Sequence, residues 1–232
     1  MPPEADAARL GLIALAWLGY FALHSALASL ALKRWVARRF PSWMPGYRLA
    51  FNALALVLLI PPLALTYAER GPWLWQWTGF GWWLANGLAV AALLAILWSL
   101  RWYDGRELLG LRQWRGRVLS PEDQERFHLS PLHRFVRHPW YSLALVLIWT
   151  RDMDLAFLVT AVMASLYLAI GARLEEAKLL VYHGEVYRRY RERVPSLIPL
   201  PWRFLTAEAA ERLAANAPDK GIGPQMNANK RS

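Results

Sequence analysis

Two polar motifs in the C-terminal half of the chain carry residue types that suit a binding site for charged groups. One is Arg137-His138-Pro139-Trp140-Tyr141 and the other is the pair Glu175-Glu176. Pro139 suits the first turn of a helix, where its missing N–H costs nothing, and it keeps the preceding residue extended. Arg137 and His138 should then lie at a helix entrance, whose free N–H groups attract an anion. On spacing alone, a basic residue beside an ordinary helix start explains this motif more simply.

The glutamate pair follows an apolar stretch, at the end of a helix where the helix dipole favours cations instead. This placement needs a compensating positive charge, which a cationic ligand supplies. Ion pairs of Glu176 with Arg173 and of Glu175 with Lys178, at helical spacing, are the structural alternative. Together the two motifs predict a pocket with an anion-favouring end and a cation-favouring end, suited to a zwitterionic, amino-acid-like ligand.

Two further histidines, His128 and His133, precede His138 at intervals of five residues. This interval does not place side chains on one helical face, and no carboxylate or thiol completes a metal site around them. The chain contains no cysteine, which excludes disulfides and a cysteine nucleophile. The sequence therefore predicts no metal site.

Apolar stretches surround these motifs and must position them. Of the 232 residues, 56% are hydrophobic and only 19% are charged, below the quarter that is usual in soluble domains. Three stretches come near the roughly 20 residues that a membrane helix needs, and a shorter pair follows around a polar turn. The five stretches are 10–32, 49–67, 79–100, 140–150 and 155–171. The last two predict a helical hairpin with a short first arm; the alternatives are one buried soluble helix there and a signal peptide at 10–32.

The basic residues are sorted between the apolar stretches. The net charge of +10 on its own also suits a soluble protein that binds acidic partners. However, 24 of the 27 lysines and arginines lie in alternate connecting segments, and only Arg9, Arg70 and Arg151 lie in the others. By the positive-inside rule, this predicts five spans in a bacterial inner membrane, with the N-terminus outside and the C-terminus cytoplasmic. Five tryptophans between Trp73 and Trp83 predict an aromatic belt at the outer interface.

The predicted fold is therefore all-α: a polytopic membrane protein of about five transmembrane helices, including a C-terminal helical hairpin, with a cytoplasmic pocket. Residues 1–205 form this domain, and 206–232 predict a short amphipathic helix followed by a disordered tail. Polar side chains inside the spans, among them His24 and Asn52, need a partner or a cavity. An interhelical hydrogen bond between these two is expected, with contact to a substrate as the alternative.

The order of the motifs resembles the signature of the isoprenylcysteine carboxyl methyltransferase superfamily of membrane enzymes. That signature is Arg-His-Pro-x-Tyr, a short hairpin, Glu-Glu and then Gly184, Tyr187, Tyr190 and Pro199. Three further stretches, HSALAS…LKRW, LLGLRQW and LIWTRDM, resemble its NnrU-like and methanethiol S-methyltransferase branch. The similarity covers about residues 20–200.

The resemblance implies that S-adenosylmethionine binds in a cytoplasmic pocket formed by about residues 105–203. Carried over position by position, Glu175 would bind the cationic amine of the cofactor. His133 stands where the carboxyl methyltransferases have a cofactor-contacting tyrosine. Gly171 stands where the isoprenylcysteine enzymes have a substrate-binding arginine, which argues against a prenylcysteine carboxylate as substrate. The implied cofactor-binding residues are His128, His133, His138, Pro139, Trp140, Tyr141 and Glu175.

We therefore expect S-adenosylmethionine-dependent methyl transfer to a small thiol or a lipophilic acceptor at the cytoplasmic face, and we assign no catalytic base. A non-catalytic NnrU-like accessory protein and a membrane reductase with a nicotinamide cofactor are the alternatives. The expected partners are the acceptor and membrane lipids, without nucleic acid or metal.

Overall fold

The computed structural model describes residues 3–116 and 129–215. Helices dominate it, and the only sheet of the described part pairs two very short strands antiparallel, with Trp73 opposite Asp154 and Trp75 opposite Met153. The elements in chain order are α1 (Pro3–Ala28), α2 (Leu30–Arg39), η1 (Pro41–Trp43), α3 (Met44–Ala68), β1 (Trp73–Trp75), α4 (Gly79–Ser99), η2 (Leu100–Trp102), α5 (Gly105–Leu109), α6 (Leu111–Arg115), η3 (Pro131–Arg134), α7 (Pro139–Trp149), β2 (Met153–Asp154), α8 (Leu155–Arg193) and α9 (Ala207–Ala215).

Within the described residues, four helices are long and apolar enough to cross a membrane. The candidate spans are Asp6–Ala28, Pro41–Ala68, Gly79–Trp102 and Leu155–Val181. A fifth apolar helix, α7, has only 11 residues and is the short first arm of the hairpin with α8. Many leucines of these helices are exposed, as expected for surfaces that face lipid. The prediction of an all-α polytopic membrane protein is confirmed.

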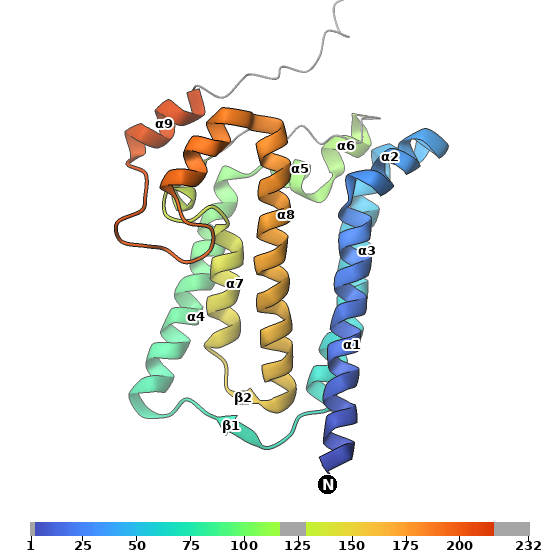
Figure 1. The fold of residues 1–232 in the computed structure, drawn as a ribbon, viewed down its shortest axis with the longest axis vertical. Helices are drawn as coiled ribbons and strands as arrows, with labels where there is room; N and C mark the ends of the chain where they lie inside the picture. Colours follow the sequence, from blue (N-terminus) through green and yellow to red (C-terminus); the bar gives the residue numbers. More distant parts are fainter. Residues whose placement is uncertain (1–2, 117–128, 216–232) are drawn as a thin grey trace, which may run out of the picture.

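The four candidate spans, in α1, α3, α4 and α8, run along the length of the molecule, and the shorter α7 lies beside α4 and α8 (Figure 1). The short helices α2, α5, α6 and α9 lie at one end, and the N-terminus, β1 and β2 lie at the other. The segments that hold most of the basic residues thus share one end. At the opposite end, Arg9 forms an ion pair with Glu69 at 2.6 Å, and Arg70 lies 3.7 Å from Asp154.

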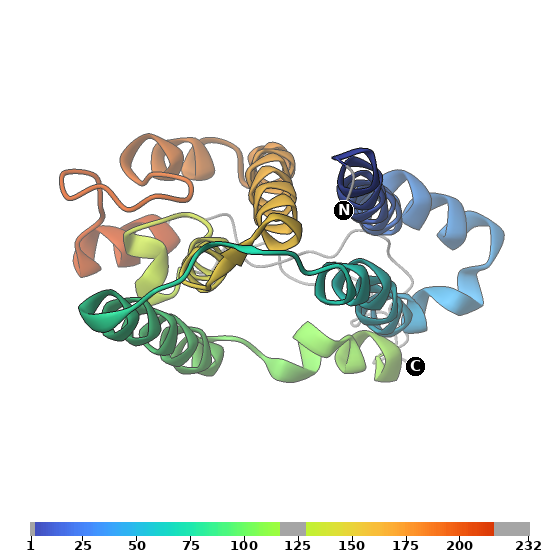
Figure 2. The same cartoon turned by 90° about the horizontal axis from the view of Figure 1, so that it is seen from below.

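Buried hydroxyl groups join the helices toward the end of the bundle that carries β1 and β2, where α1 packs against α3 and α8. The Trp17 indole donates to the Thr160 hydroxyl at 2.9 Å, and the hydroxyls of Thr66 and Thr160 are 2.7 Å apart. Seen from below, α1 and α3 form one group, and α4, α7 and α8 form a second (Figure 2). Because polar groups in lipid must find partners inside the protein, these bonds help to fix how the two groups meet.

The structure corrects two details of the first half. The first apolar stretch is not one helix: α1 ends at Ala28, and Ser29 caps α2 by accepting a hydrogen bond from the Leu32 N–H at 3.2 Å. The expected bond between His24 and Asn52 is also wrong. His24 Nδ1 lies 2.6 Å from the Tyr167 hydroxyl of α8, and this bond is interhelical as expected, but with another partner.

Asn52 instead holds the connection between α5 and α6 against α3. Its amide donates to the carbonyls of Leu108 and Leu109 at 3.1 and 3.3 Å. The next residue, Gly110, has φ +89°, and a Cβ added there would lie 2.8 Å from the Leu49 nitrogen. Both the positive φ and the close approach therefore require glycine in the LLGLRQW stretch.

Candidate functional site

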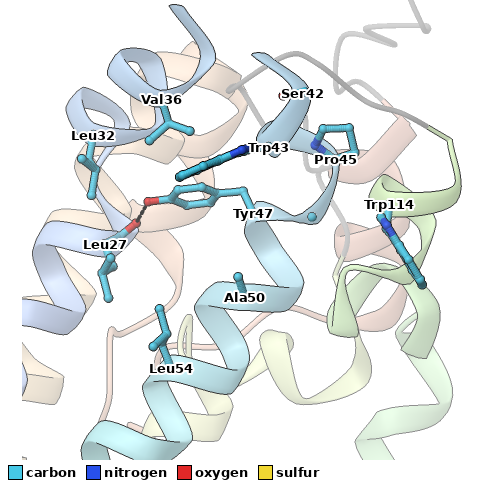
Figure 3. A pocket seen from close by; sticks show the side chains of 11 residues that line it. Leu27, Leu32, Val36, Ser42, Trp43, Pro45, Tyr47, Ala50, Leu54 and Trp114 are labelled. Carbon is cyan, nitrogen blue, oxygen red and sulfur yellow. Dashed lines mark hydrogen bonds between the residues drawn. The ribbon is translucent and has the colours of Figure 1, made fainter. Parts of the chain in front are cut away.

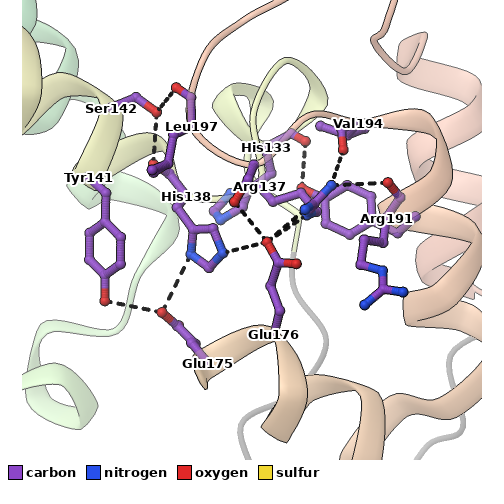
Figure 4. A network of polar contacts seen from close by, with 12 residues as sticks. His133, Arg137, His138, Tyr141, Ser142, Glu175, Glu176, Arg191, Val194 and Leu197 are labelled. Atoms are coloured by element: carbon purple, nitrogen blue, oxygen red, sulfur yellow. Dashed lines mark hydrogen bonds and ion pairs between the residues drawn. The ribbon is translucent and has the colours of Figure 1, made fainter. Parts of the chain in front are cut away.

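Three segments that are distant in sequence meet at the basic end of the bundle: the entrance of α7, the middle of α8, and residues 194–197 (Figure 4). Arg137 N–H donates to the Pro195 carbonyl at 2.9 Å, and His138 N–H donates to the Ser196 carbonyl at 3.1 Å. These backbone bonds place the two basic side chains opposite the Glu175-Glu176 pair. Pro139 begins α7 as predicted, and the two glutamates contact the side chains of Arg137 and His138 beside this entrance.

The first part of the site, which we call the closed half, consists of Arg137, Glu176 and Ser196. Glu176 Oε1 accepts hydrogen bonds from Arg137 Nε and Nη2 at 2.9 and 2.7 Å and from the Ser196 hydroxyl at 2.8 Å. The side chains of Arg137 and Glu176 are each 9% exposed. Nη1 of Arg137 donates to the carbonyls of Arg191 and Val194. Buried charges are tolerated when they are paired and hydrogen-bonded this fully.

A bend in α8 brings the far end of this helix back over the closed half. Gly184 has φ +52° and ψ −124° inside α8, values that favour glycine. Beyond it, Tyr187 and Tyr190 are each 2% exposed and pack with Val194. Burial raises the pKa of Tyr190, so its hydroxyl stays protonated and donates to the His133 carbonyl at 2.7 Å. The Gly-x-x-Tyr-x-x-Tyr motif thus serves to build the wall of the site.

His138 connects the two glutamates. Its Nε2 lies 3.1 Å from Glu176 Oε1, and its Nδ1 lies 3.4 Å from Glu175 Oε2. Burial alone would lower the pKa of His138, but its hydrogen bonds and attraction to Glu175 and Glu176 outweigh burial and raise it. Only the imidazolium form can donate from both ring nitrogens, so the geometry and the raised pKa agree.

The second part, which we call the open half, consists of Glu175 and Tyr141. The Tyr141 hydroxyl donates to Glu175 Oε2 at 3.1 Å, and the Tyr141 ring stacks on His138 with centroids 5.3 Å apart. The Glu175 side chain is 45% exposed, and within the described part of the chain no hydrogen bond reaches its Oε1. An oriented carboxylate with one available oxygen beside an aromatic ring suits an ammonium group.

The remaining predicted residues lie around this centre. The Trp140 indole donates to the Ser99 hydroxyl at 2.7 Å, which ties α7 to α4. His133 takes part in the cap of η3, with Nδ1 2.7 Å from the Ser130 hydroxyl. His128 lies outside the described residues. The structure therefore brings His138, Tyr141 and Glu175 together directly, with Pro139 at the start of the same helix.

Sequence reasoning missed the main partners of Glu176. The alternative pair of Glu176 with Arg173 is wrong, because Glu176 binds Arg137 from another segment. No sequence pattern indicated Ser196, although it follows Val194-Pro195 in the closing stretch of the motif. Among residues 3–116 and 129–215, no three or more His, Cys, Asp or Glu side chains group in a way that could hold a metal.

An apolar groove of about 950 Å³ lies on other elements, between α1, α2, α3 and α6 (Figure 3). Across one side of it the Tyr47 hydroxyl donates to the Leu27 carbonyl at 2.8 Å. Its lining is almost wholly apolar and contains no residue of the polar network. The lining residues are Leu27, Leu32, Val36, Ser42, Trp43, Pro45, Gly46, Tyr47, Ala50, Leu54 and Trp114.

Comparison with known proteins identifies relatives over most of the chain. Methanethiol S-methyltransferase of Crocosphaera subtropica is 32% identical, over 81% of this chain and 74% of the relative. The enzyme of the same name from Mycobacterium tuberculosis is 33% identical, over 82% and 78%. Nurim of Rattus norvegicus is 29% identical, over 77% and 72%.

Neither a family model nor a solved structure matches the chain. The names of these relatives nevertheless agree with the branch that the sequence motifs resemble, so this resemblance is confirmed. The chain belongs to the methanethiol S-methyltransferase family.

Proposed function

We propose that this protein transfers the methyl group of S-adenosylmethionine to a small thiol at the cytoplasmic face of the membrane. The observation that carries the proposal is the open half: a half-exposed Glu175 carboxylate held by Tyr141 and His138. Methanethiol, which appears in the names of the relatives, is the first acceptor to test. Dimethyl sulfide would then be the product.

The chemistry of the open half suits the amino-acid end of the cofactor. Glu175 Oε1 would accept hydrogen bonds from the ammonium group, while the bonds from Tyr141 and His138 to Oε2 hold the carboxylate in place. Pro139, Trp140 and His133 are proposed to complete the binding site, with His128 as a further contact. When bound, S-adenosylmethionine supplies a methyl group that its sulfonium already activates.

The task of the residues is then to hold and orient the methyl donor and to exclude water. A thiol loses its proton in solution to a useful extent, so the proposal assigns no catalytic base. The same proposal places the site on the cytoplasmic side of a bacterial inner membrane, with the N-terminus outside. Its support is the sorting of the basic residues in the sequence, where 24 of the 27 lie in alternate connecting segments. The described parts of those segments lie at the end of the molecule that carries the polar network.

The test is methyl transfer by the purified protein in neutral detergent, with methyl-labelled S-adenosylmethionine and methanethiol. We expect label in dimethyl sulfide, with no transfer to a prenylcysteine analogue or to phospholipid under the same conditions. Thermal unfolding with S-adenosylhomocysteine and with NADPH provides an independent readout of the cofactor. Stabilisation by NADPH alone, without methyl transfer to any acceptor, would contradict the proposal and favour a reductase.

A further inference from the structure

The apolar groove lies where two candidate membrane spans meet the segment that connects them. Its inner wall includes Leu27 and Leu54, which belong to the candidate spans Asp6–Ala28 and Pro41–Ala68. From Pro45 to Leu54 the groove follows about 14 Å of α3 at the usual helical rise. Among the described residues that line it, there is no Asp, Glu, Lys or Arg. The groove therefore matches an acyl chain in chemistry.

The segment that supplies much of the groove lining is strongly basic in sequence. Residues 29–48 contain five basic residues and no acidic residue. Two of the five, Arg38 and Arg39, are exposed at the end of α2, and neither forms an ion pair in the described parts of the chain. The exposed Trp35 and Trp43 lie in the same segment, as is usual for residues at a membrane interface.

Aromatic contacts connect one of these cations to the groove itself. The Arg39 guanidinium lies 5.2 Å from the centre of the Phe40 ring, and Phe40 stacks on Trp43 at 4.7 Å. Trp43 is a lining residue of the groove. Basic residues in the last turn of α2 also interact favourably with the dipole of this helix, but that interaction does not require them to lie near the groove. The stack therefore connects the positive charge of Arg39 to a residue that lines the groove.

We propose that this groove binds an anionic phospholipid, with one acyl chain along α3 and the phosphodiester headgroup at Arg38 and Arg39. Basic pockets beside transmembrane helices bind anionic headgroups in this manner. The site shares no residue with the open or the closed half, so it stands independently of the proposed methyl transfer.

The first experiment is thermal unfolding of the full-length protein in neutral detergent with phosphatidylglycerol or with phosphatidylcholine of the same acyl chains. At about 100-fold above its Kd, we expect phosphatidylglycerol to raise Tm by roughly 5–10 °C. Phosphatidylcholine should raise Tm by much less, and glycerol phosphate without acyl chains should not change it. Equal shifts with both lipids would overturn the proposal, and a shift with glycerol phosphate would indicate an anion site without a lipid.

Variants then locate the effect. Arg38→Gln/Arg39→Gln should remove the preference for phosphatidylglycerol, and Ala50→Trp, which narrows the groove at an exposed position, should reduce the shift with both lipids. The matched control is Arg188→Gln/Arg189→Gln, which removes the same charge from another exposed pair at the same end. An equal loss in the control, or an unchanged shift in Ala50→Trp, would place the lipid elsewhere. Stabilisation that follows protein concentration instead of lipid would show that a second copy occupies the groove.

Discussion

The closed and open halves of the site place two adjacent glutamates in opposite situations. Glu176 is nearly buried, and the donors of Arg137, His138 and Ser196 converge on one of its oxygens. Glu175 is half-exposed, and only its Oε2 is held by the protein. The comparison indicates that the two carboxylates have different roles. Glu176 joins the segments of the site, whereas Glu175 keeps one oxygen that is available for the proposed cofactor. Each prediction below tests this difference.

The largest expected effect is on stability, from Glu176→Gln. The variant leaves the Arg137 charge buried without its anionic partner, which typically costs about 3–5 kcal/mol and would lower Tm by roughly 6–20 °C. Thermal unfolding in detergent measures the shift. The control is Glu185→Gln, whose exposed pairs with Arg188 and Arg189 contribute about 1 kcal/mol at most. Similar Tm values for the two variants would contradict a structural role of Glu176.

The next effect is on binding, from Glu175→Gln. Loss of a charged hydrogen bond to the cofactor costs about 1.5–3 kcal/mol, which corresponds to roughly 10- to 100-fold weaker binding. Titration calorimetry with S-adenosylhomocysteine measures the affinity, and Tm should change far less than in Glu176→Gln. Unchanged affinity in a folded Glu175→Gln protein would refute the assignment of the open half to the cofactor.

Tyr141→Phe should have a smaller effect in the same direction. The ring keeps its stack on His138, but Glu175 loses a donor, which is worth about 0.5–1.5 kcal/mol, or roughly 2- to 10-fold in affinity. Tyr190→Phe is the matched control: it loses the bond to the His133 carbonyl, so it should reduce stability without weakening binding. Weaker binding in Tyr190→Phe together with unchanged binding in Tyr141→Phe would contradict the roles assigned to the two halves.

The smallest effect depends on pH and concerns His138, which links the halves. Because its pKa is raised in the folded protein, His138 contributes stability that is complete below the ordinary value of about 6.5. This contribution is lost as the pH rises through the folded pKa. The difference in Tm between the wild type and His138→Gln should therefore be larger at pH 6 than at pH 9. A constant difference across this range would mean that the imidazolium is not the form that joins the glutamates.

Local patterns in the sequence were sufficient to predict the helices and the hairpin. The arms at 140–150 and 155–171 correspond to α7 at Pro139–Trp149 and the start of α8 at Leu155, because apolar length and the polar turn are local signals. The helix α8 extends to Arg193, well past the apolar stretch that ends at residue 171. The segment that follows α8 covers its polar part, since Ser196 binds Glu176 and Val194 packs against Tyr187.

The partners of polar residues could not be predicted in the same way. Helical spacing suggested Arg173 for Glu176, but the partner is Arg137, 39 residues earlier. His24 likewise bonds Tyr167, 143 residues later. Such pairs depend on how helices are placed beside one another, and periodicity along one helix contains no information on that placement. Spacing alone left the roles of Glu175 and Tyr141 open. The resemblance to a family predicts that both bind the cofactor, and this role stays a prediction.

The bend at Gly184 also bears on how the site forms during folding. A straight α8 of 39 residues would extend about 58 Å, well beyond a membrane core of about 30 Å, and would carry Tyr187 away from Glu176. With the bend, Glu176 and the Arg191 carbonyl, which both bind Arg137, come from one short stretch of chain. Closing so short a loop costs little entropy, and contacts of low sequence separation form early. One glycine therefore lets a single helix supply two walls of the site from residues that are close together in sequence.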